Sequence, residues 1–92
     1  MTPTPPNSPA NDSQALALSA LAATLTDERR AEGFLSITGL SPDGIRASLG
    51  NRHTLAACLA FLENYEPDLV AVAQAIGVKP EALIAARADL ER

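Results

Sequence analysis

The spacing of the apolar side chains most restricts how this chain can fold. From residue 12 onward, leucine, isoleucine, valine and alanine recur every three or four positions. No stretch alternates apolar and polar residues in the way that a half-buried strand requires. A period near 3.6 residues places such side chains along one face of an α-helix. The sequence therefore predicts an all-α fold.

Capping residues divide this pattern into five or six short helices. The first helix is predicted to begin at Asp12 or Ser13 and to end near Leu25. Thr26, which precedes two acids, predicts the cap of a second helix to about Thr38. The predicted inner stripes are Leu18, Leu21 and Leu25, with Leu16 beside them, in the first helix, and Ala31, Phe34, Leu35 and either Thr38 or Ile37 in the second.

Serine, asparagine, proline and glycine mark the limits of the remaining helices. The predicted starts are a Ser41 cap, an Asn51 cap, Glu66 and Pro80, and the predicted ends include Gly39, Gly50, Gly77 and Leu90. The predicted inner residues are Leu55, Cys58, Leu59 and Leu62, then Leu69, Val72, Ala73 and Ile76, then Leu83, Ala86, Arg87 and Leu90, with Ala57, Phe61 and Tyr65 on a second apolar stripe. The short connections favour a compact orthogonal bundle over an up-and-down bundle.

The N-terminal segment, MTPTPPNSPAN, differs in composition from the rest of the chain. It contains four prolines and no large side chain after the methionine. Because it has little to bury and lacks backbone donors at its prolines, we predict a disordered tail at residues 1–11 and a single helical domain at residues 12–92. Pro3–Pro6 could serve as a polyproline ligand, but an ordinary disordered terminus is the favoured interpretation.

Charge and composition restrict the classes of partner. The formal net charge is −4, and the seven cations are scattered, with only Arg29 and Arg30 adjacent. This distribution argues against nucleic-acid binding and against anionic membranes. Only 3% of the residues are aromatic, so the core must consist mainly of aliphatic side chains and alanine, and a homodimer that buries more surface is compatible with that composition.

The last two predicted helices have the spacing of a helix-turn-helix unit. Small Ala73, the turn at Gly77 and apolar Val78 lie between two apolar helices within residues 66–91. A DNA-binding regulator that uses this segment is therefore an alternative function. The outer positions of the last helix, however, hold Lys79, Glu81, Ala82 and Ala85, where base-reading helices usually present Arg, Asn or Gln.

The residues that could carry catalysis or bind a metal do not form a recognisable set. His53 and Cys58 are the only histidine and the only cysteine, and five positions on a helix turn them roughly 500° apart, onto different faces. Most of the acidic residues fall in the first turns of predicted helices, where orphan backbone donors favour negative charge. We therefore predict no catalytic residue, no metal site and no cofactor, and no enzymatic activity.

The remaining possibility is a surface that binds a protein. We predict a small protein-interaction or adaptor module, with the DNA-binding regulator as the alternative; a carrier of a small apolar ligand is a third possibility. Leu16, Leu18, Leu21 and Leu25 could form a groove or a self-association stripe, although a role in the core is favoured. No positively charged start precedes an apolar run, so we expect a cytoplasmic protein without a membrane span.

Two stretches carry a resemblance to a known family. The segment FLSITGLSP at residues 34–42 and the region from Phe61 to Glu81 resemble a family of short bacterial proteins, mainly alphaproteobacterial, that is catalogued only as a domain of unknown function. The similarity covers roughly Ala15 to Leu90 and includes F-L-x-x-T-G-L and A-x-x-x-G-x-x-P-E-x-L. The resemblance implies a compact helical fold and a cytoplasmic bacterial origin, and it brings no catalytic or binding residues.

Overall fold

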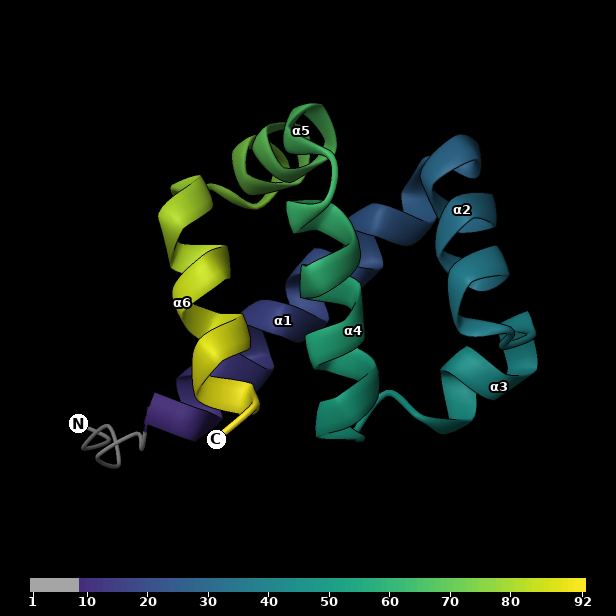
Figure 1. Cartoon of the computed structure of the whole chain (residues 1–92), viewed down its shortest axis with the longest axis horizontal. Helices are drawn as coiled ribbons and strands as arrows, with labels where there is room; N and C mark the ends of the chain where they lie inside the picture. The colour runs from purple at the N-terminus through teal and green to yellow at the C-terminus, as the bar shows by residue number, and fades with distance from the viewer. Residues whose placement is uncertain (1–8) are drawn as a thin grey trace, which may run out of the picture.

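The computed structural model describes residues 9–92 and contains six α-helices in that range (Figure 1). The predicted all-α class is confirmed, and the helix count is the larger of the two predicted. The helices are α1 (Pro9–Thr26), α2 (Glu28–Thr38), α3 (Pro42–Ala47), α4 (Arg52–Glu63), α5 (Glu66–Ile76) and α6 (Pro80–Leu90).

Four of the helices, α1, α4, α5 and α6, form the core of the bundle. The most extensive helix-to-helix contacts join α1, α4 and α6, and α5 packs against all three (Figure 1). Polar contacts also join α6 to its neighbours: Ser13 Oγ donates to Asp89 at 2.8 Å, Arg52 Nε donates to the carbonyl of Leu90 at 3.0 Å, and Arg87 donates to Glu63. The buried apolar residues of these four helices are Ala17, Ala20, Leu21, Leu55, Ala56, Cys58, Leu59, Leu62, Leu69, Val72, Ala73, Leu83, Ala86 and Leu90.

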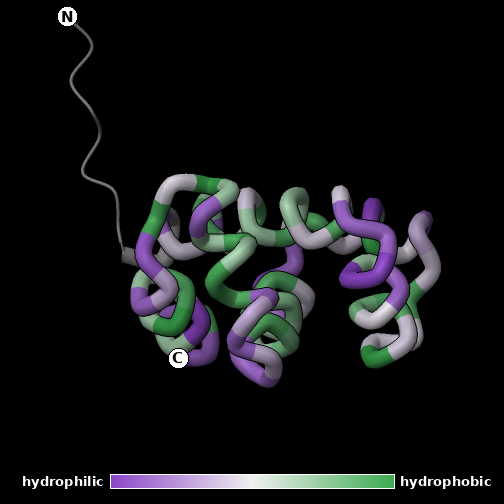
Figure 2. The backbone as a smooth tube through the Cα atoms, turned by 90° about the horizontal axis from the view of Figure 1, so that it is seen from above, coloured by the Kyte–Doolittle hydropathy of each residue, from purple (hydrophilic) through white to green (hydrophobic). Residues whose placement is uncertain are grey.

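The other two helices, α2 and α3, form an arm at one side of the core. Figure 2 shows the same separation from above. The α2 helix contacts α1 and, more sparsely, α4, while α3 makes few contacts with any other helix. Each arm helix has one buried apolar side chain, Phe34 in α2 and Ile45 in α3. The arm is therefore attached through few buried residues.

The helix limits follow local capping chemistry. The side chains of Ser41 and Asn51 accept backbone hydrogen bonds at the starts of α3 and α4, as predicted. The predicted Thr26 cap of α2 is wrong, because Asp27 is the cap and the Thr26 hydroxyl donates to the carbonyl of Ala23. The carboxylate of Asp27 accepts a hydrogen bond from the backbone of Arg30, which lowers the pKa of Asp27 below its usual value.

Two turns require glycine. Gly39 ends α2 with a φ of 71°, and Gly77 ends α5 with a φ of 77°. Both angles lie in the left-handed region, where a Cβ atom is strained. The two predicted helix ends at these glycines are confirmed.

The inner stripe of α1 differs from the prediction. Leu21 is buried, but Leu18 and Leu25 are exposed, so the prediction is wrong for those two leucines. Small residues occupy the inner face instead, at Ser13, Ala17, Ala20 and Thr24. Small side chains allow the helix backbones of α1, α4 and α6 to approach closely, and this packing outweighs the higher hydrophobicity of leucine.

The N-terminal limit also differs. The α1 helix begins at Pro9, three positions before Asp12, the earlier of the two predicted starts. Pro9 is the first residue of the helix. Proline is tolerated there because the backbone N–H that it lacks would have no hydrogen-bond partner within the helix. Residues 1–8 of the segment predicted to be disordered lie outside the described residues.

The inner faces of the last three helices agree with their predicted patterns. All four predicted residues of α4 are buried, as are Leu69, Val72 and Ala73 in α5 and Leu83, Ala86 and Leu90 in α6. The prediction is wrong for Ile76 and Arg87, which are only half-buried. Within residues 9–92, no helix has both the length and the apolarity to cross a bilayer by itself; α5 and α6 reach that threshold only together, and their axes are bent by 98°.

Candidate interaction surfaces

The residues considered for catalysis or metal binding lie apart in the fold. His53 is exposed in the first turn of α4, whereas Cys58 is buried between α4 and α1. The thiol of Cys58 lies 3.7 Å from the hydroxyl of Thr24, and burial raises its pKa to about 11. In the described part of the chain, no group of three or more His, Cys, Asp or Glu side chains could hold a metal ion.

The α5 and α6 helices have the geometry of a helix-turn-helix unit. Residues 77–79 connect them, Gly77 adopts the left-handed conformation, and the axes cross at 98°. The amide of Val78 donates to the carbonyl of Ala73 at 2.9 Å, which closes the turn. The predicted helix-turn-helix-like shape of the C-terminal pair is therefore present.

The charges on α6 do not favour a phosphate backbone. The guanidinium of Arg87 is bound to Glu63 and to Glu91, and Arg92 lies 3.5 Å from Asp89. Lys79 and Glu81 are both exposed at the start of the helix, so their charges oppose each other there. Within the described part of the chain, most cations of α6 therefore lie close to a carboxylate, which weakens their attraction for DNA phosphates.

A more distinctive surface lies between α2, α4 and α5, which we call the Tyr65 groove. Its volume is about 330 Å³, and its lining residues are Arg29, Gly33, Ile37, Phe61, Asn64, Tyr65 and Asp68. Ile37 is 67% exposed and Tyr65 is 53% exposed, the two highest values among the large apolar side chains of residues 12–92. Two large apolar residues with so much exposed surface therefore border the same hollow.

The polar part of the Tyr65 groove is organised by one buried carboxylate. Asp68 is buried, and it accepts a hydrogen bond of 2.6 Å from Nη2 of Arg29. The hydrogen bond raises the pKa of Arg29, and the same guanidinium lies 5.8 Å from the centre of the Tyr65 ring. Arg30 also lies 3.8 Å from Asp68. Asp68 therefore holds Arg29 against Tyr65 and leaves most of its five N–H donors available to a partner.

Close packing between α2 and α4 forms the base of this groove. A Cβ atom on Gly33 would lie 3.2 Å from the ring of Phe61, so glycine permits this approach. The rings of Phe61 and Phe34 are 5.7 Å apart and tilted by 60°, a favourable aromatic arrangement. The aromatic pair fixes the side of α2 that carries Ile37.

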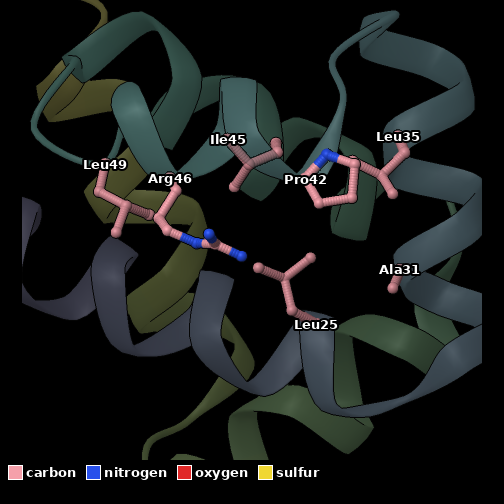
Figure 3. A pocket seen from close by; sticks show the side chains of 7 residues that line it. All are labelled: Leu25, Ala31, Leu35, Pro42, Ile45, Arg46 and Leu49. Atoms are coloured by element: carbon pink, nitrogen blue, oxygen red, sulfur yellow. The ribbon is translucent and has the colours of Figure 1, made fainter.

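A second hollow lies on the opposite side of α2, and we call it the aliphatic groove. It has a volume of about 420 Å³ and lies between α1, α2 and α3 (Figure 3). Its lining residues are Leu25, Ala31, Leu35, Pro42, Ile45, Arg46 and Leu49. Figure 3 shows the side chain of Arg46 extending over the groove toward Leu25. The lining is thus apolar except for one guanidinium.

The sequence patterns did not identify either groove. Tyr65 was predicted on an apolar stripe of the fourth helix, and Ile37 was one of two alternatives for the inner face of the second. The structure buries part of Thr38 instead and exposes Ile37. The leucine stripe considered for self-association is divided, because Leu21 is buried while Leu25 borders the aliphatic groove. One weak signal in the sequence pointed to such surfaces: the helices contain more apolar residues than a single helix face can bury.

Comparison with known proteins assigns a family but no activity. A family model described as a protein of unknown function (DUF3572) matches residues 10–92. No curated protein matches the chain. No solved structure matches it either.

Proposed function

The chain belongs to the family of proteins of unknown function DUF3572, and we propose that it acts as a protein-interaction module that binds its partner in the Tyr65 groove. The observation that carries this proposal is that Ile37 and Tyr65, both mainly exposed, border one groove beside Arg29. Exposed apolar side chains that cluster in a hollow are typical of surfaces that bind another protein.

The chemistry of this groove resembles that of binding hot spots. Tyrosine and arginine are over-represented at such positions, because each combines a large contact area with polar donors. Arg29 is already oriented by Asp68 and Tyr65, so a partner need not restrict a freely moving side chain. The partner we propose presents an apolar side chain between Ile37 and Tyr65 and a carboxylate to Arg29.

We further propose that the chain has no catalytic activity of its own. A general base and a nucleophile must lie within hydrogen-bond reach of each other, and the exposed His53 and the buried Cys58 lie on different faces of α4. The raised pKa of Cys58 also keeps its thiol protonated near neutral pH.

A pair of matched variants tests the interaction. Ile37→Lys and Ile84→Lys both place a cation at an exposed isoleucine of an 11-residue helix, but only Ile37 borders the Tyr65 groove. Tagged wild-type protein should retain a stoichiometric partner from cells of its host, Ile84→Lys should retain it, and Ile37→Lys should lose it. Equal retention by both variants, or equal loss, would contradict the proposal, and circular dichroism checks that both fold.

A DNA-binding regulator is the second candidate, and the crossing of α5 and α6 at 98° favours it. Retention on duplex DNA should then weaken steeply as salt rises, since binding would release counterions from phosphates. Lys79→Ala should weaken that retention, whereas Ile37→Lys should not. Absence of salt-dependent retention would leave the Tyr65 groove as the better candidate.

A further inference from the structure

We propose that the aliphatic groove is a second binding site, independent of the Tyr65 groove, and that it takes a small free ligand with an aliphatic chain and a carboxylate. The groove has a volume of about 420 Å³, within the usual range for small-molecule sites. It lies on the other side of α2 from the Tyr65 groove, so the two sites share no lining residue.

The apolar part of the groove suits an aliphatic chain. Ile45 is buried, while Leu25 and Pro42 are exposed at the groove. Among residues 9–92, no aromatic side chain lines this groove, which distinguishes its chemistry from that of the Tyr65 groove. An aliphatic chain that lay along Leu25 and Leu35 would remove the exposed surface of these two leucines from water.

The single charged residue of the groove indicates the head group. Arg46 is 74% exposed, and Nη1 of its guanidinium donates a hydrogen bond of 3.2 Å to Asp43 on the same helix. Surface ion pairs of this kind are weak, so a ligand carboxylate can compete for the guanidinium. Arginine binds carboxylates through two parallel N–H donors, and Figure 3 shows the guanidinium among the lining residues, directed toward Leu25.

The location of α3 explains how the groove can admit a ligand. This six-residue helix makes few contacts with the rest of the bundle and has one buried residue, Ile45. A helix held by so few contacts can adjust its position at small cost, because little apolar surface is exposed when it moves.

Octanoate is the probe that tests this site, with octan-1-ol and octyltrimethylammonium as neutral and cationic probes of the same chain length. In NMR titrations of the full chain, octanoate should shift the methyl signals of Leu25, Leu35 and Ile45. Octanoate should also bind about fivefold more tightly than octan-1-ol, since the arginine contributes a charge-assisted hydrogen bond. The cationic probe should bind more weakly than both.

Two arginines provide a matched pair of variants. Arg46 and Arg92 are 74% and 80% exposed, and each pairs with an aspartate three residues earlier, but only Arg46 lines the groove. Arg46→Glu should weaken octanoate binding about tenfold or more, because it replaces attraction with repulsion, and Arg92→Glu should leave it unchanged within about twofold. Asp43→Asn should strengthen binding, because it removes the competing carboxylate.

Several results would overturn the proposal. Equal affinity for octanoate and octan-1-ol would show that Arg46 does not bind the carboxylate. Equal losses of octanoate affinity in Arg46→Glu and Arg92→Glu would show the same. Shifts confined to residues outside the groove would place the ligand elsewhere. Retention on phosphatidylglycerol vesicles without binding of free octanoate would assign the surface to a membrane. A concentration-dependent dimer that octanoate does not dissociate would assign it to a second copy.

Discussion

The core of α1, α4, α5 and α6 and the arm of α2 and α3 bury their side chains to different extents. In α4, five of the twelve residues are buried, whereas α2 and α3 bury one residue each. Side-chain contacts such as Ser13 with Asp89 also join distant parts of the core. The arm is held mainly by Phe34 and Ile45, and both grooves lie beside it.

Stability and binding reside in different parts of this small domain. Local opening is expected where few apolar contacts must break, and binding surfaces are often found in such regions. The core can therefore keep the chain folded while the arm presents α2 to solvent on two sides. We therefore expect comparable substitutions in the two regions to have different effects.

The largest expected effect is the loss of a core leucine. Leu59→Ala should lower the free energy of unfolding by about 3 kcal/mol, because it removes a fully buried side chain and leaves a cavity. Leu35→Ala in the arm should cost about 1 kcal/mol, because Leu35 is only half-buried. Denaturant unfolding monitored by circular dichroism measures both, and equal losses would show that the arm is packed as tightly as the core.

The next largest effect is an alkaline loss of stability caused by Cys58. Its pKa is about 11 in the folded chain against a usual value of 9.0, because burial disfavours the thiolate. The protonated thiol therefore contributes fully below pH 9, and that contribution is lost as the pH rises from 9 to 11. The loss should reach about 2–3 kcal/mol, at about 1.4 kcal/mol per pKa unit.

Cys58→Ala provides the control for this pH dependence. Because the other titratable groups are unchanged, the difference between wild type and variant isolates the thiol. Denaturant unfolding at pH 8 and pH 11 should show a smaller loss in the variant. Identical losses would show that Cys58 does not remain buried and protonated, and would weaken the description of the α1–α4 contact.

Two glycines allow the same substitution to be compared in the two regions. Gly77→Ala and Gly39→Ala each place a Cβ atom at a φ near +75°, which costs about 1–2 kcal/mol. Gly77 joins two core helices, so its substitution should lower the global stability. Gly39 joins the two arm helices, so its substitution should mainly speed amide hydrogen exchange in α3.

Amide exchange measured by mass spectrometry distinguishes these outcomes. For Gly39→Ala, protection in α4 and α6 should stay close to that of the wild type, whereas Gly77→Ala should reduce it in both helices. If Gly39→Ala lowers protection in α4 as much as in α3, the arm and the core unfold as one unit.

The same contrast explains how much could be predicted from the sequence. The inner face of α4 was predicted correctly, since a central helix buries a broad apolar surface and its leucines leave little choice of face. The inner face of α1 was not, because Ala17, Ala20 and Thr24 pack closely against neighbouring helices while the exposed Leu18 carries the stronger hydrophobic signal. Hydrophobicity alone does not record how closely two backbones approach.

The candidate sites were harder to predict than the fold. Ile37 belongs to the apolar pattern of α2, as a buried residue would. It is exposed because the arm lies at one side of the core. Similarly, Arg29 and Asp68 are 39 positions apart, and nothing in the sequence indicates that they meet. Capping signals such as Ser41 are local and were identified, whereas a groove depends on how helices are placed relative to one another.

The smallest expected effects come from two ion pairs. Glu63 binds Arg87 through both carboxylate oxygens and joins α4 to α6, whereas Asp43 pairs with Arg46 within α3. Glu63→Gln should lower the free energy of unfolding by about 1 kcal/mol, because it weakens a partly buried bidentate contact. Asp43→Asn should cost about 0.2 kcal/mol or less, since the pair is exposed. Urea midpoints at low and high salt measure both, and only the Glu63→Gln effect should persist in high salt, where exposed charges are screened. If both variants lower the free energy of unfolding equally, ion pairs across the core stabilise the fold no more than ion pairs within the arm. That result would contradict the proposed difference between core and arm.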